Sequence, residues 1–86
     1  MCRNITTLRG LQPGATPEEI EAAARQYVRK VSGVVRPSVA NGPAVEEAVA
    51  AIAAATTSLL ERLPPRHQPP PTVPPLRRLA AAPSAL

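Results

Sequence analysis

A cysteine at position 2 is the residue of this sequence best placed to carry chemistry. Removal of Met1 would leave Cys2 at the amino terminus, with its thiol beside a free α-amine. Such a pair can act as nucleophile and base, or chelate a metal ion. A reactive thiol also needs an orienting partner, but the chain has no Asp, and its single His67 lies in a proline-rich stretch. We therefore favour a packed or exposed thiol and keep an enzyme or redox protein built on Cys2 as the alternative.

Basic side chains between positions 25 and 36 suggest a second kind of site. Arg25, Arg29, Lys30 and Arg36 could bind phosphate or a nucleic-acid backbone, in keeping with the net charge of +4. No aromatic platform accompanies them, and cations near a helix end are common for structural reasons alone. Nucleic-acid binding is thus a further alternative. The sequence has no metal-spaced cluster or glycine-rich phosphate loop, so we expect no metal and no cofactor.

The elements that must position these residues begin with a helix expected at 17–32. Thr16 is a good N-cap, Pro17 suits the first helical position, and Glu19 completes a capping box. Gly33 then suits the left-handed position that follows a helix. The apolar residues recur at the spacing of one buried face, made of Ile20, Ala23, Ala24, Tyr27, Val28 and Val31.

A second helix is expected at 43–63. Pro43 is tolerated in a first turn, which favours capping by Asn41 over capping by Ser38, and Pro64 ends the helix. Apolar residues alternate at spacings of four and three along one seam. This interaction seam consists of Val45, Val49, Ile52, Thr56, Leu59 and Leu63.

The two helices are flanked by an arm and a tail. The arm, 1–15, contains glycine and proline and is expected to be mostly irregular, with Ile5, Leu8 and Leu11 packing on the helices. The tail, 64–86, holds 8 of the 12 prolines and is expected to be disordered. The sequence therefore predicts one small domain at 1–63.

Composition narrows the class of protein. With no Phe, no Trp and one Tyr, a domain of this size has little material for a core, so a protein partner or a homodimer is expected. One cysteine excludes an internal disulfide framework. The start of the chain does not resemble a signal peptide, and the longest apolar run is far shorter than the about 20 residues of a membrane span. We expect a cytoplasmic protein without a membrane segment.

Three stretches together resemble a small bacterial family of unknown function, DUF2277. They are the opening Met1-Cys2-Arg3-Asn4-Ile5 with Thr7-Leu8, the Ala15-Thr16-x-x-Glu19-Ile20 motif, and Val28-Arg29-Lys30-Val31-Ser32-Gly33 followed by Pro37-Ser38-x-Ala40-Asn41. The resemblance covers residues 1–63. It implies a short helical protein and brings no assigned activity with it. If the family has a functional surface, the matching residues are Cys2, Arg3, Asn4, Arg29, Lys30, Ser38 and Asn41.

The fold class expected from the sequence is all-α. A short arm would precede two helices packed as an antiparallel hairpin, and two copies could meet in a four-helix arrangement. The function that fits best is a non-catalytic protein-interaction or self-association module that uses the interaction seam.

Overall fold

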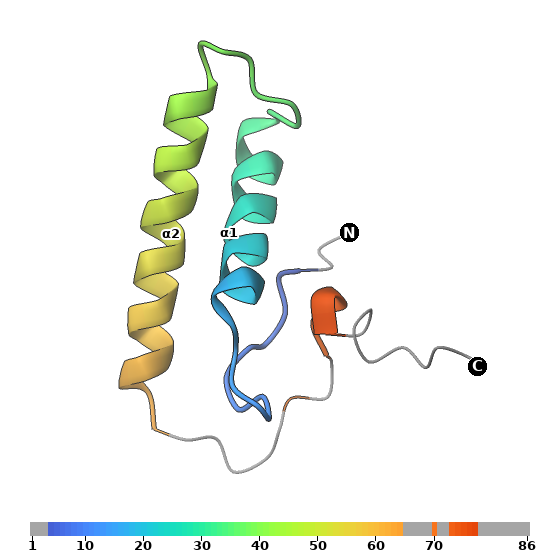
Figure 1. The fold of residues 1–86 in the computed structure, drawn as a ribbon, viewed down its shortest axis with the longest axis vertical. Coiled ribbons are helices and arrows are strands. Elements are labelled where there is room, and N and C mark those ends of the chain that lie inside the picture. Colours follow the sequence, from blue (N-terminus) through green and yellow to red (C-terminus); the bar gives the residue numbers. More distant parts are fainter. Residues whose placement is uncertain (1–3, 65–69, 71–72, 78–86) are drawn as a thin grey trace, which may run out of the picture.

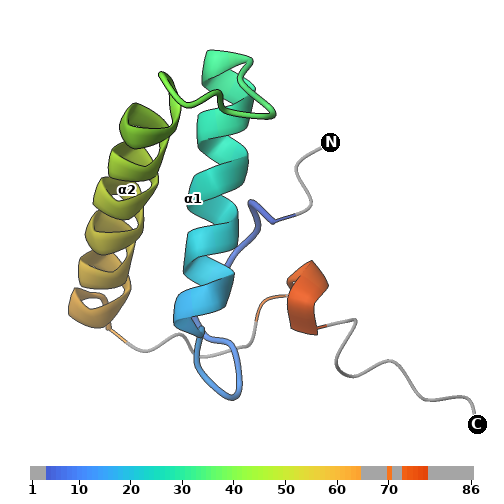
Figure 2. The same cartoon turned by 45° about the horizontal axis from the view of Figure 1, so that its top comes forward.

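The protein folds as two antiparallel helices with an irregular arm beside them (Figure 1). A computed structural model describes residues 4–64, 70 and 73–77. Helix α1 spans Pro17–Ser32 and helix α2 spans Gly42–Arg62; within the described ranges there is no strand. The expected all-α hairpin is therefore confirmed. Figure 2 shows, from a second direction, the arm running along α1 toward the end of the hairpin at which α1 begins.

Both ends of α1 form as its sequence predicts. The Thr16 hydroxyl accepts a hydrogen bond from the Glu19 backbone N–H at 3.1 Å, and a Glu19 carboxylate oxygen accepts one from the Thr16 N–H at 2.9 Å. This capping box satisfies two backbone donors that helical geometry leaves without partners. At the other end, Gly33 has a φ of 73°, and its N–H donates to the Arg29 carbonyl.

Helix α2 begins and ends one residue earlier than expected. Asn41 occupies the N-cap position, but its side chain makes no capping hydrogen bond. Its backbone N–H donates instead to the Ser38 hydroxyl at 3.1 Å, so Ser38 organises the turn before the helix. The helix ends at Arg62, because Leu63 adopts extended backbone and Pro64 cannot continue the helical hydrogen bonding.

Two small apolar clusters hold the hairpin together. The first lies between the helices and consists of Ala24, Val28, Val45 and Val49. The second lies where the arm meets the start of α1 and consists of Leu8, Leu11 and Ile20, with Ala53 and Leu60 of α2 against it. Two of the three apolar arm residues are thus buried as expected, whereas Ile5 stays largely exposed.

A charged group also joins the helices. Arg25 of α1 donates to Glu46 of α2 at 2.7 and 3.0 Å, and to Glu21 one turn earlier at 2.9 Å. These hydrogen bonds raise the pKa of Arg25 and lower the pKa of Glu46. Because all three side chains are at least partly exposed, this group directs the pairing of the helices more than it stabilises them.

The predicted disordered tail lies mostly outside the described residues, where it remains a prediction. Residues 75–77 form one helical turn, in which the Arg77 N–H donates to the Pro74 carbonyl at 3.0 Å. In Figure 1 this turn lies beside the arm.

Helix α2 is long and apolar enough, by length and composition alone, to cross a membrane. This is weak evidence, because core helices and signal sequences pass the same test. In the hairpin, Val45 and Val49 of α2 are buried against α1.

Replacing Ala24 with Leu should separate the helices. Ala24 is 2% exposed in the cluster between them, so the larger side chain should cost about 1–3 kcal/mol in the free energy of unfolding. Ala50→Leu is the matched control, since Ala50 is an exposed position of α2 and should change stability by less than about 0.5 kcal/mol. Urea unfolding followed by circular dichroism measures both. Equal stability of the two variants would contradict this account of the core.

Candidate functional sites

An apolar groove runs between α1 and the first half of α2. Its volume is about 380 Å³, at the low end of the range for ligand pockets. Val28 and Val45 are buried in its lining, while Tyr27 and Val31 are 49% and 66% exposed. No charged side chain belongs to the lining, which consists of Tyr27, Val28, Val31, Ser32, Val34, Ala40, Asn41, Ala44, Val45, Ala48 and Ile52.

A second hollow continues this groove toward the arm. It shares Tyr27 and Ile52 with the groove and adds Ile5 and Thr6 from the arm. Its lining is also without charge. Together the groove and the hollow form one apolar face of the hairpin. The charged pair Glu21 and Glu46 lines a different hollow on the helices.

The predicted interaction seam is divided between the core and the surface. Val45 and Val49 are buried against α1, and Ile52 packs half-buried at the edge of the same cluster. Leu59 and Leu63 are exposed, and Thr56 donates its hydroxyl hydrogen to the Ile52 carbonyl at 2.7 Å. The first half of the seam therefore joins the two helices of one chain. What the second half contacts outside the chain stays a prediction.

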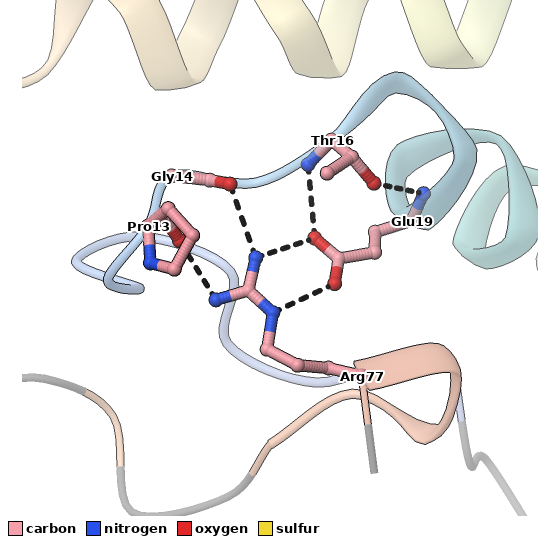
Figure 3. Close-up of polar contacts among 5 residues, drawn as sticks. All are labelled: Pro13, Gly14, Thr16, Glu19 and Arg77. Atoms are coloured by element: carbon pink, nitrogen blue, oxygen red, sulfur yellow. Dashed lines mark hydrogen bonds and ion pairs between the residues drawn. The ribbon is translucent and has the colours of Figure 1, made fainter. Parts of the chain in front are cut away.

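A polar site forms where the C-terminal segment meets the start of α1 (Figure 3). The Arg77 guanidinium donates through Nε to Glu19 Oε2 at 3.0 Å and through Nη2 to Oε1 at 3.1 Å. It also donates to the Pro13 carbonyl at 2.7 Å and to the Gly14 carbonyl at 3.0 Å. The side chains of Glu19 and Arg77 are only 4% and 18% exposed. One arginine thus joins the arm, α1 and the C-terminal segment.

The ionisation of Glu19 reflects this setting. Burial raises the pKa of its carboxyl group, but the hydrogen bond from the Thr16 backbone and the hydrogen bonds and charge of Arg77 lower it by more. The net result is a pKa below the ordinary value of 4.5. The carboxylate is therefore the form that the fold stabilises.

A second arginine fixes the arm to the other helix. Arg9 donates through Nε and Nη2 to the Pro64 carbonyl at 3.1 and 2.8 Å. Pro64 follows directly after the end of α2, so this contact ties the arm to the exit of that helix. The loop between Arg9 and Pro13 is consequently held from both sides.

The candidate surface residues from the family resemblance are spread along the hairpin. Arg29 and Lys30 are exposed in the last turn of α1, and Ser38 and Asn41 lie in the connector at the same end. The backbone N–H of Asn4 donates to the Gln26 side chain at 2.7 Å, which places Asn4 farther along α1. Whether these residues form a functional surface stays a prediction.

The predicted nucleophile lies outside the described residues, as do Arg3 and His67. Among the residues that the structure describes, no three His, Cys, Asp or Glu side chains gather closely enough to hold a metal ion. Catalysis by Cys2 and binding of nucleic acid by the basic residues both remain predictions.

Sequence reasoning identified Glu19 as a cap but missed its partner. Glu19 and Arg77 are 58 positions apart, and no local pattern links a carboxylate in a capping box with an arginine in a proline-rich tail. The available signal was the strong positive charge of the tail, which was interpreted as solvated.

Replacing Glu19 with Gln should remove a pH-dependent part of the stability. The folded-state pKa of Glu19 is lowered, so its contribution is complete above about pH 4.5 and is lost as the pH falls through the folded-state pKa. Near pH 7, wild type should exceed Glu19→Gln by about 2 kcal/mol in unfolding free energy, and the difference should vanish on acidification. Glu18→Gln, at an exposed neighbouring position, is the control. A pH-independent difference for Glu19→Gln would contradict the assignment.

Comparison with known proteins identifies a family. The family model described as "Uncharacterized conserved protein (DUF2277)" matches residues 1–83. The match extends 20 residues beyond the 1–63 expected from the sequence, so Arg77 lies within it. No curated protein and no solved structure showed a significant match. The resemblance noted from the sequence is confirmed, and the chain belongs to the DUF2277 family.

Proposed function

We propose that the protein is a non-catalytic interaction module that binds a second copy of itself through the apolar groove. The observation that carries the proposal is the uncharged lining of this groove, with Tyr27 and Val31 about half or more exposed at its rim. Covering a Val-sized side chain releases roughly 1.5–3 kcal/mol relative to leaving it in water. A partner that covered several such side chains would gain substantially.

The shape of the hairpin supports a second copy as the occupant. Two antiparallel helices with one apolar face can pair with the same face of another hairpin and form a four-helix bundle. Such a two-fold contact places each residue type near itself or its neighbours, so charged residues within it would repel. The groove avoids this problem, because Glu21, Arg25 and Glu46 pair with one another outside its lining.

The amount of core supports the same conclusion. The buried apolar residues of the described chain are Leu8, Leu11, Ile20, Ala24, Val28, Val45 and Val49, none of them aromatic. Small domains with so little burial are marginally stable as monomers. Association through the groove would add the exposed Tyr27 and Val31 to an enlarged core.

The chemistry of the groove supports binding rather than catalysis. Its polar side chains are Tyr27, Ser32 and Asn41, and the Ser32 hydroxyl already donates to the Val28 carbonyl at 2.6 Å. The lining offers no carboxylate, thiol or imidazole to act as a general acid or base.

Replacing Val31 with Glu should abolish self-association and leave the hairpin folded. Val31 lies at the groove rim and is already 66% exposed, so a charge there should harm the dimer far more than the monomer. Val39→Glu is the matched control, since Val39 is 98% exposed in the connector and does not line the groove. Sedimentation from micromolar to millimolar concentrations would measure the mass, and circular dichroism the helix content.

Wild type and Val39→Glu should show a dimer whose thermal midpoint rises with concentration, because dissociation accompanies unfolding. Val31→Glu should be a folded monomer. A wild-type monomer at every concentration would contradict the proposal, even if another protein were found in the groove. A dimer that Val31→Glu leaves intact would place the interface elsewhere.

A further inference from the structure

The contact between the C-terminal segment and the start of α1 has the form of a receptor with its ligand in place. A guanidinium group has five N–H donors in a rigid fork. Arg77 forms four hydrogen bonds there, two to the Glu19 carboxylate and one each to the carbonyls of Pro13 and Gly14. Figure 3 shows these acceptors surrounding the guanidinium.

The acceptors are positioned by bonds that do not involve the arginine. The capping box holds the Glu19 carboxylate against the Thr16 N–H. The two carbonyls belong to the loop of the arm, which Leu11 anchors in the cluster with Ile20. The cradle formed by Pro13, Gly14 and Glu19 is thus organised by the helix cap and the arm, and the arginine enters a site that is already shaped.

The cradle is selective for a planar, forked cation. Two carboxylate oxygens accept from Nε and Nη2 side by side, while the two carbonyls accept from Nη1 and Nη2. An ammonium group has its donors on a single nitrogen and cannot span these four acceptors at once. The Glu19 side chain, at 4% exposed, also has little water available to replace a lost cation.

We propose that the cradle at the start of α1 is a guanidinium-binding site, and that Arg77 is its resident ligand, so that the C-terminal segment acts as a latch on the hairpin. This site is separate from the apolar groove, whose lining includes none of its residues. When Arg77 is absent, the cradle accepts a small guanidinium cation from solution. The inference is therefore independent of the proposed self-association.

Chemical rescue of the full-length Arg77→Ala variant tests the proposal. Loss of the arginine should increase the unfolding equilibrium constant roughly 10- to 100-fold, as expected for charge-assisted hydrogen bonds in a mostly buried site. Methylguanidinium at millimolar concentration should restore part of the loss. At ten times its dissociation constant, the ratio of folded to unfolded protein should rise roughly 11-fold. Methylammonium at the same concentration and ionic strength should not restore it.

Three further variants make the rescue specific. Wild type and Arg62→Ala, which removes an exposed arginine of α2, should show no stabilisation by methylguanidinium. The double variant Glu19→Gln with Arg77→Ala should lose the rescue, because the carboxylate is gone. Arg77→Lys should be destabilised nearly as much as Arg77→Ala. Equal rescue by methylammonium, or rescue of the double variant, would overturn the proposal.

A measurement on wild type decides the question even if the variants fail to fold. The Nε–H of a docked Arg77 should give a slowly exchanging signal in nuclear magnetic resonance spectra near neutral pH. This signal should move or disappear as acidification protonates Glu19. An Arg77 signal that exchanges as fast as that of a free arginine would mean that the latch is open in solution and the proposal is wrong.

Discussion

The fold depends on how little apolar surface two short helices can cover for each other. Their contact is made by small side chains, with Ala24 and Val28 facing Val45 and Val49. Small residues let the helices approach closely, but each contributes little burial. The contact therefore leaves apolar side chains of both helices at its edge. The arm covers some of that edge with Leu8 and Leu11, and the groove around Val31 is the part left open.

Polar contacts supply what this thin core cannot. Arg25 links the two helices on one side, Arg9 ties the arm to the exit of α2, and Arg77 ties the C-terminal segment to the start of α1. Only the last of these involves a strongly buried carboxylate, that of Glu19. Breaking a buried pair leaves an uncompensated charge, so this contact has the largest consequence when one partner is lost.

The sequence predicted local structure well because the signals were local. Thr16, Pro17, Glu19 and Gly33 determine α1 at the residues that the structure shows, and α2 is displaced by only one residue. The apolar spacing gave the direction of each buried face but not its width. Tyr27 and Val31 follow the helical period of the buried face, yet α2 covers only the part of α1 near Val28.

The remaining features could not be predicted because they join residues far apart in the chain. The cradle combines a loop of the arm, a helix cap and an arginine 58 positions later. No spacing rule relates such residues, and a proline-rich composition favours disorder over docking. The asymmetry of the seam, with Val49 inside the hairpin and Leu59 exposed, likewise depends on how far the shorter helix extends along the longer one.

The position of Glu19 gives two identical neighbours very different freedom to change. Glu18 and Glu19 are adjacent and both lie in the first turn of α1, yet only Glu19 both caps the helix and receives Arg77. Aspartate at position 19 would keep the charge but draw it back by one methylene, away from two sets of partners at once. Position 18 has no such requirement. Within one turn of helix, sequence drift among related chains should therefore be broad at one glutamate and narrow at the next.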